Sequence, residues 1–92
     1  MKIIKRDGSE VTFDITKIAN AIKAASDESP ESERLTDRQI DYAAHNVTDL
    51  CEEAGHTVSV EEVQDMVENE IMALHKFEVA RRYIIYRYVQ NL

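Results

Sequence analysis

The order of apolar and polar positions predicts a short β-hairpin followed by four helices. Two apolar stretches, residues 3–5 and 11–13, flank an Asp7-Gly8 pair. Glycine tolerates the positive φ that a two-residue hairpin turn requires, so this pair marks a tight turn. From Ile15 onward, apolar residues recur every three or four positions, which is the period of a helix with one buried face. We therefore expect an α+β fold in which an N-terminal hairpin covers a four-helix bundle.

The first two helices are expected at residues 15–25 and 36–55. The first helix carries its apolar stripe at Ile15, Ile18 and Ile22. Residues 26–33 are polar and acidic and contain the single proline, so they are expected to form a loop. The second helix begins with a capping box of Thr36 and Gln39 and ends at Gly55. Its inward face is predicted to hold Ile40, Ala43, Ala44, Val47, Leu50, Cys51 and Ala54.

Two more helices follow a brief extended piece at residues 56–58, for which a third strand against the hairpin is an open alternative. Ser59 and Glu62 form a second capping box. It opens a helix whose apolar positions are Val60, Val63, Val67, Ile71 and Leu74. The last helix, residues 77–91, is apolar almost all round, although a helix on one side of a small domain should show a polar face. We expect this excess, around Ile85 and Tyr86, to meet another copy of the chain or the body of a larger enzyme, with additional core as the alternative.

The composition is that of one globular domain spanning residues 1–92. The chain is 43% hydrophobic and 32% charged, which excludes a disordered segment. No apolar run approaches the roughly 20 residues of a membrane span, so a cytoplasmic location is expected. The single cysteine, Cys51, excludes an internal disulfide and is predicted to be a core thiol. The three histidines, His45, His56 and His75, lack the spacing of metal ligands and are read as surface or capping residues.

Charge is distributed unevenly along the chain, whose net charge is -7. Residues 1–23 carry five basic and three acidic groups, whereas the other 69 residues carry six basic and fifteen acidic groups. A strongly acidic chain is a poor general binder of nucleic acid, because such binding depends on neutralising phosphates. A small basic corner on an acidic body suits a compact anion such as a nucleoside triphosphate, with random scatter of surface charge as the alternative.

The basic corner adjoins the start of the first helix. Lys5, Arg6 and Lys17 lie close in sequence to its free N–H groups, and such donors together with Lys and Arg suit a polyphosphate. Lys17 falls in the first helical turn, where a cation is unfavourable beside the helix dipole unless an anion is present. Asp14 precedes this helix and is either its N-cap or a ligand contact. The common glycine-rich phosphate-loop motifs are absent, and the paired acids Glu61-Glu62 and Glu52-Glu53 are read as solvated helix faces.

Four motifs, in order, resemble those of the ATP-cone, a regulatory domain at the front of many ribonucleotide reductases. They are Lys5-Arg6-Asp7-Gly8, Asp14-Ile15-Thr16-Lys17-Ile18, Val58-Ser59-Val60-Glu61-Glu62-Val63 and Val79-Ala80-Arg81-Arg82-Tyr83-Ile84-Ile85-Tyr86-Arg87. The resemblance covers essentially the whole chain. The ending Tyr-Ile-Ile-Tyr-Arg is most similar to the anaerobic reductases that act on ribonucleoside triphosphates.

The resemblance implies that ATP or dATP binds between the hairpin and the helices, together with Mg²⁺ carried by the triphosphate. Lys5, Arg6 and Lys17 would contact phosphates. Ile3 and Val11 would form an apolar lid on the adenine, and Asp14 would hydrogen-bond the base or the sugar. The third helix would close the site through Val60 and Gln64. Some family members have a phosphate-contacting histidine where this chain has Gln64. The role implied is allosteric control of a reductase, with no catalysis by the domain itself.

Two other functions remain open from the sequence. A zinc-ribbon repressor of reductase genes also carries an ATP-cone, so a nucleotide-responsive transcriptional regulator is one alternative. The start at the hairpin and the single cysteine argue against the repressor. Because the chain stops at its last helix, without the residues of a reductase body, we expect a domain excised from the N-terminus of a larger enzyme. The other alternative is a helical interaction domain without a ligand. Neither nucleic acid nor a membrane is an expected partner.

Overall fold

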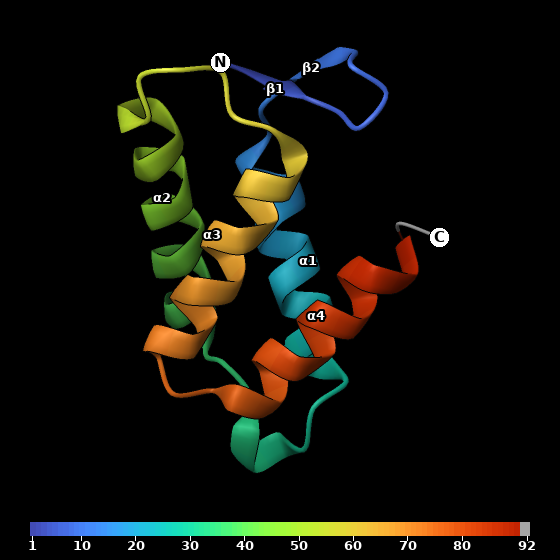
Figure 1. Cartoon of the computed structure of the whole chain (residues 1–92). Coiled ribbons are helices and arrows are strands. Elements are labelled where there is room, and N and C mark those ends of the chain that lie inside the picture. The colour runs from blue at the N-terminus through green and yellow to red at the C-terminus, as the bar shows by residue number, and fades with distance from the viewer. Residues whose placement is uncertain (91–92) are drawn as a thin grey trace.

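A computed structural model describes residues 1–90 and shows a hairpin lying across one end of a four-helix bundle (Figure 1). This confirms the α+β class. In chain order the elements are β1 (Lys2–Ile4), β2 (Glu10–Thr12), α1 (Ile15–Asp27), a short 3-10 helix η1 (Glu31–Glu33), α2 (Asp37–Glu53), α3 (Val60–Ala73) and α4 (Phe77–Gln90). The last helix begins where the sequence predicts, and its expected end at residue 91 lies outside the described residues.

The hairpin is antiparallel, with Ile3 opposite Val11. Its loop is longer than the predicted two-residue turn. The Lys5 N–H donates to the Ser9 carbonyl at 2.7 Å, and the Gly8 N–H donates to the Lys5 carbonyl at 2.9 Å. Three residues, 6–8, therefore connect the paired positions, and Gly8 closes the loop at φ 87° as three-residue hairpins require.

A side chain explains why the two-residue turn was the wrong prediction. Asp7 Oδ1 accepts hydrogen bonds from the Ser9 N–H at 2.9 Å and from the Ser9 hydroxyl at 2.6 Å. An aspartate that bonds the backbone two residues ahead forms a turn of its own, and here it stabilises the longer connection. These bonds also hold the pKa of the Asp7 carboxyl below its usual value.

The hairpin is fastened to the segment that precedes α3. The Ile4 N–H donates to the Val58 carbonyl at 3.0 Å, and Ile4 forms an isolated parallel bridge with Ser59. This single bridge stands where a third strand was the open alternative, so the sheet among the described residues has two strands. Ile3 and Val58 are buried at this junction, 5% and 1% exposed.

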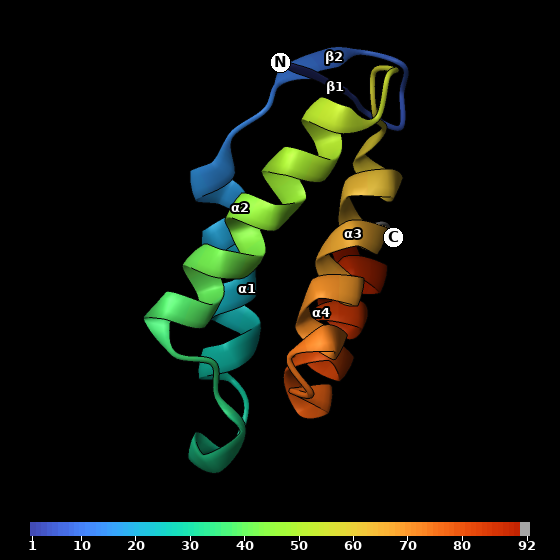
Figure 2. The ribbon, with the colours of Figure 1, turned by 90° about the vertical axis from the view of Figure 1, so that its left-hand side faces the viewer.

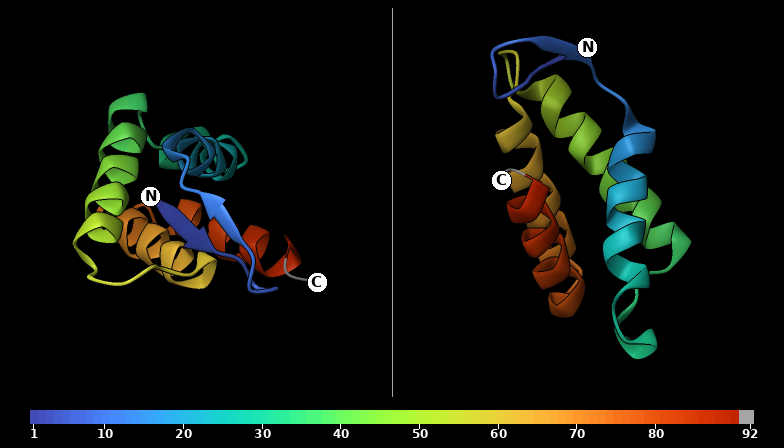
Figure 3. Two further views of the ribbon diagram at one scale, coloured as in Figure 1. Left: turned by 90° about the horizontal axis from the view of Figure 1, so that it is seen from above. Right: turned by 90° about the vertical axis from the view of Figure 1, so that its right-hand side faces the viewer.

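The helices form a ring in which each one packs against two neighbours, in the order α1, α2, α3, α4 and back to α1. From the side, α1 and α2 make one pair and α3 and α4 the other (Figure 2). Seen along the bundle, the hairpin runs between the starts of α1 and α3 (Figure 3). The most deeply buried apolar side chains belong to every helix: Ile22, Ala43, Val47, Val67, Ile71 and Val79.

Residues 26–33 are more ordered than the predicted loop, because α1 continues to Asp27 and η1 follows. Two buried serines account for this. The Ser26 hydroxyl accepts a hydrogen bond from the Leu35 N–H at 2.9 Å, and the Ser29 hydroxyl donates to the Ala25 carbonyl at 2.9 Å. Because both hydroxyls are satisfied by backbone groups, these polar residues can be buried instead of exposed.

Both predicted capping boxes are present, at Thr36–Gln39 and Ser59–Glu62. The second helix ends earlier than expected, at Glu53, and Gly55 follows with φ 76°. Leu50 was predicted to face inward but is 42% exposed, because it lies at the edge of the buried stripe of α2. Within the described part of the chain, no helix has the length and apolarity that crossing a bilayer demands.

Replacing Ser26 by Ala is expected to lower the free energy of unfolding by about 1–3 kcal/mol, because the buried Leu35 N–H would lose its acceptor. Chemical denaturation monitored by circular dichroism measures this. Ser32→Ala, at an exposed position of η1, is the matched control and should change the free energy by about 0.5 kcal/mol or less. Equal midpoints for both variants would show that the Ser26 hydroxyl does not stabilise the fold.

Candidate functional site

A pocket of about 260 Å³ opens between the hairpin and helices α1, α3 and α4. Six of the eight candidate residues line it, namely Ile3, Val11, Asp14, Lys17, Val60 and Gln64. The sequence places these residues up to 61 positions apart, and the fold brings them to one cavity. The remaining lining residues are Thr12, Phe13, Ile18, Ala21, Val63, Tyr83 and Tyr86, which sequence reasoning did not assign to the site.

The walls of the pocket are largely apolar. Ile3 and Val11 are neighbours across the two strands of the hairpin and line one wall of the pocket. Val60 and Val63, in the first turns of α3, line another part of it. A concave apolar pocket with a few polar groups is the usual form of a small-molecule site. It suits a flat heterocyclic ring.

Two tyrosines of α4, Tyr83 and Tyr86, complete the wall. They are three residues apart, so they lie on the same side of the helix. Tyr83 is 5% exposed, and burial raises the pKa of its hydroxyl to about 12, so it stays protonated at neutral pH. The signal that could have found them is their i, i+3 spacing. It was overlooked because α4 was interpreted only as core or as a surface for partners.

Asp14 and Lys17 bring polar groups from the start of α1. Asp14 is the N-cap, and its Oδ1 accepts a hydrogen bond from the Thr16 N–H at 2.9 Å, which confirms the N-cap alternative. Lys17 is exposed, the first turn of α1 contains no acidic residue, and among residues 1–90 Lys17 forms no ion pair. An unneutralised cation at a helix N-terminus is disfavoured by the dipole, and a bound anion would remove that penalty.

Gln64 has an unusual environment. Its Oε1 is buried and has no hydrogen-bond partner among the described residues. A buried polar atom without a partner costs about 1–3 kcal/mol. A ligand that supplied a hydrogen bond to the Gln64 amide would recover this energy.

Lys5 and Arg6, the other two candidates, do not line the pocket. They belong to the exposed hairpin loop, which overhangs the start of α3 (Figure 2). Arg6 Nε lies 3.1 Å from Glu61 Oε1, in an ion pair between the loop and the first turn of α3. The structure therefore gathers the apolar residues and Lys17 around the cavity and directs Arg6 to a carboxylate beside it.

The acidic residues along the first half of α3 are paired with bases from other elements. Glu61 and Glu62 keep side-chain exposures of 38% and 44%, as a solvated face requires, and each also has a basic partner. Besides the Arg6 contact, His56 Nε2 lies 2.8 Å from Glu62 Oε2. One guanidinium nitrogen of Arg87, on α4, lies 2.7 Å from a carboxylate oxygen of each of two further acids, Asp65 and Glu68. These ion pairs join α3 to the hairpin loop, to the α2–α3 connection and to α4.

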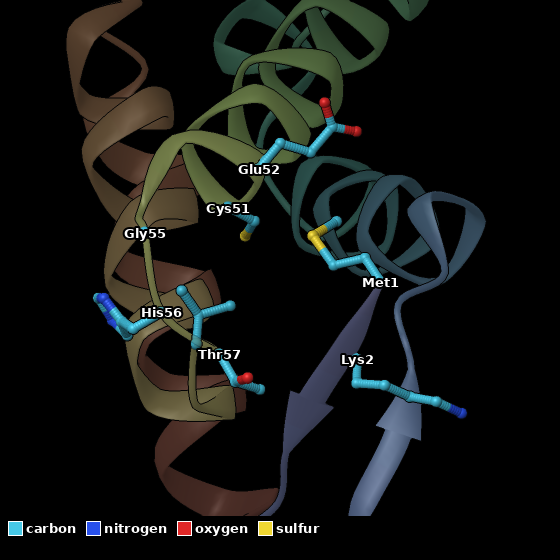
Figure 4. A pocket seen from close by; sticks show the side chains of 8 residues that line it. Met1, Lys2, Cys51, Glu52, Gly55, His56 and Thr57 are labelled. Carbon is cyan, nitrogen blue, oxygen red and sulfur yellow. The ribbon is translucent and has the colours of Figure 1, made fainter.

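A second hollow, of about 370 Å³, lies between the end of α2, the following loop and β1 (Figure 4). None of the eight candidate residues lines it. In Figure 4 its Lys2 and His56 side chains point in opposite directions, so they do not converge on a common ligand. Cys51 borders this hollow but is 4% exposed, with its Sγ 3.7 Å from Met66 Sδ, which confirms it as a core thiol. Burial raises the pKa of the Cys51 thiol and keeps it protonated.

The described residues contain no group of three or more His, Cys, Asp or Glu side chains arranged to hold a metal ion. The fold and the pocket together describe a small α+β domain with a candidate small-molecule site. The ATP cone domain family matches residues 1–92, and the chain belongs to that family. Its members are regulatory domains that bind ATP or dATP as effectors and are not catalytic.

Curated relatives of the chain include reductases and a transcriptional repressor. The chain is 36% identical to the anaerobic ribonucleoside-triphosphate reductase of Haemophilus influenzae over 90 residues, which are 98% of this chain and 12% of that protein. It is 26% identical to the ribonucleoside-diphosphate reductase subunit alpha of Chlamydia trachomatis, over 95% of this chain and 9% of that protein. It is 31% identical to the transcriptional repressor NrdR of Chromobacterium violaceum, over 99% of this chain and 58% of that protein.

The contact between His56 and Glu62 should make stability depend on pH. Hydrogen bonding and the charge of Glu62 raise the pKa of His56 above its ordinary value of 6.5. The stabilisation is therefore complete below that value and is lost as the pH rises through the higher, folded-state pKa. We expect Tm to fall between about pH 6 and 8, and to fall less in His56→Gln.

Thermal melting across this pH range measures the difference. His45→Gln, at an exposed histidine that bonds a carbonyl of its own helix, is the control and should retain the wild-type profile. Identical pH profiles for wild type and His56→Gln would mean that this contact does not contribute.

Proposed function

We propose that the chain is an allosteric domain that senses ATP and dATP and controls the overall activity of a ribonucleoside-triphosphate reductase in deoxyribonucleotide synthesis. The observation that carries this proposal is the convergence of six expected contact residues on one pocket of a domain in the ATP cone family. The greater identity to the anaerobic reductase than to the diphosphate reductase favours the anaerobic type as parent. This chain spans 12% of that reductase. In the proposal it is the regulatory part of a longer, cytoplasmic protein that also contains the catalytic body.

In the proposed complex, the adenine lies in the apolar pocket with Ile3 and Val11 together as a lid on one side of the ring and the Val60 side of α3 opposite. The Gln64 amide would hydrogen-bond the nucleotide, and Asp14 would do so in addition to capping α1. The phosphates extend past Lys17 toward the hairpin loop, where Lys5 and Arg6 reach them. Any Mg²⁺ would be bound by phosphate oxygens, because phosphates and water are its usual ligands when a protein offers no carboxylate cage.

Regulation would follow from a shift between conformations. A nucleotide can move such an equilibrium only by its difference in affinity for the two states. Tyr86 offers a physical link, because it lines the pocket and is also 46% exposed on α4. Beside it, Ile85 is 55% exposed, and Tyr88 and Val89 are exposed as well. We propose that this surface, named here the α4 face (Ile84, Ile85, Tyr86, Tyr88 and Val89), contacts a second copy of the domain or the reductase body.

The second candidate function is control of transcription. It is favoured by the match to the NrdR repressor, of which this chain spans 58%. In that case the same pocket would bind the nucleotide, and a separate part of the protein would bind DNA. Binding of ATP is common to both candidates, so the choice depends on the protein that carries the domain.

Loss of the cations should weaken nucleotide binding. Charge-assisted hydrogen bonds to phosphate contribute roughly 1.5–3 kcal/mol each, so Arg6→Ala should reduce ATP affinity about tenfold or more. The double variant with Lys17→Ala should bind still more weakly. Isothermal titration calorimetry gives the affinities, and circular dichroism checks that the fold persists.

Lys23→Ala is the control for that experiment, because Lys23 is a basic residue of α1 that pairs with Asp27 and does not line the pocket. It should bind ATP as the wild type does. Wild-type affinity in the Arg6→Ala, Lys17→Ala protein would exclude the proposed phosphate site.

The α4 face should drive association. Ile85→Glu is expected to shift the protein toward monomer with little change in Tm, because the side chain is mostly exposed and tolerates a charge. Sedimentation velocity with and without ATP measures the change. Leu50→Glu places the same charge on an exposed apolar residue of α2 and should leave association unaltered. A wild type that stays monomeric at all concentrations, with and without ATP, would refute the proposed self-association.

A further inference from the structure

The ion pair between Arg6 and Glu61 is open to exchange. Its two side chains are 59% and 38% exposed, and Arg6 Nε and Glu61 Oε1 are 3.1 Å apart. Solvent-exposed pairs of this kind contribute only about 0.2–1 kcal/mol to stability in double-mutant cycles. A ligand with several negative charges can therefore compete for the guanidinium.

Glu61 does not depend on Arg6 to remain ionised. It lies in the first turn of α3, where the helix dipole stabilises a negative charge. A hydrogen bond from its own backbone N–H, followed by the contact with Arg6, holds the pKa of Glu61 below its usual value. Once Arg6 leaves, the carboxylate still has the helix N-terminus and water around it.

The backbone at Glu61 is also fixed independently of the pair. Arg87 Nη2 lies 3.4 Å from the Glu61 carbonyl oxygen, while Nη1 of the same residue binds Asp65 and Glu68. Since Arg87 holds the first turns of α3 from the side of α4, release of Arg6 need not disturb the wall of the pocket.

We infer that Glu61 competes with the nucleotide for the Arg6 guanidinium. Glu61 binds Arg6 in the absence of nucleotide, and a phosphate group of the nucleotide displaces Glu61 from Arg6. This inference rests on the proposed function, because it takes the phosphates of ATP as the displacing anion. Binding is then an exchange of anions on one guanidinium: the Arg6–Glu61 contact breaks, an Arg6–phosphate contact forms, and no covalent bond changes. Glu61 accordingly lowers the affinity for ligands that carry phosphates and leaves the affinity for the bare nucleoside unchanged.

A double-mutant cycle tests this exchange. Calorimetric titration with ATP is carried out on wild type, Glu61→Gln, Arg6→Ala and the double variant. Glu61→Gln should bind ATP about 1.4- to fivefold more tightly than wild type, which is the roughly 0.2–1 kcal/mol measured for exposed ion pairs expressed as an affinity ratio. The same substitution in the Arg6→Ala background should give no gain, because no guanidinium is left to release.

Two controls separate release of Arg6 from a general change in charge. Asp65→Asn removes a carboxylate one turn further along α3 that pairs with Arg87 instead of Arg6, and it should gain less than Glu61→Gln. Adenosine, which has no phosphate, should bind wild type and Glu61→Gln equally.

Each result decides between the two proposals. Three results would overturn the exchange alone, provided that the wild type binds ATP. Glu61→Gln could raise the ATP affinity even without Arg6, it could raise the affinity for adenosine, or it could leave the ATP affinity unchanged. Absence of ATP binding by the wild-type protein would overturn the proposed function and the exchange with it.

Discussion

The attachment of the hairpin to the start of α3 is the contact on which the rest of the site depends. A two-stranded hairpin is at best marginally stable by itself. Here the bond from the Ile4 N–H to the Val58 carbonyl, together with burial of Ile3, holds it against the bundle. This attachment turns a strand face into one wall of the pocket. It also brings the basic loop over a helix whose first turn contains two glutamates.

Part of the acidic charge of the chain lies on α3, where it forms ion pairs with several other elements. Its carboxylates pair with bases from the hairpin loop, from the α2–α3 connection and from α4. An excess of acidic residues would otherwise repel an anionic ligand. Pairing reduces that repulsion next to the pocket, and it leaves Lys17 as an exposed cation that no described carboxylate neutralises. The strongly acidic composition is thus compatible with a site for phosphates.

Sequence reasoning was most successful where local chemistry determines structure. The capping boxes at Thr36 and Ser59 fixed the starts of two helices, because each side chain satisfies donors only a few residues away. It failed where a distant partner decides. Nothing local indicates that the Ser26 hydroxyl meets the Leu35 N–H, or that the ring of Tyr83 faces a cavity made by three other elements. The partnership of Arg6 with Glu61, 55 positions away, was likewise invisible to motif reading.

The candidate site shows the same division. The positions of Ile3, Val11, Asp14 and Lys17 around one pocket follow from motifs within a single short stretch, and the structure brings them together. The buried, unpartnered oxygen of Gln64 depends on packing between α3 and its neighbours, which periodicity alone does not determine.

The tyrosines of the pocket wall give the domain an optical property. The chain has four tyrosines and no tryptophan, and Tyr83 and Tyr86 both line the pocket. The ultraviolet emission of the protein therefore comes in part from rings in contact with the cavity. No stronger indole emission masks it. The domain thus contains its own spectroscopic label at the place where a ligand would bind.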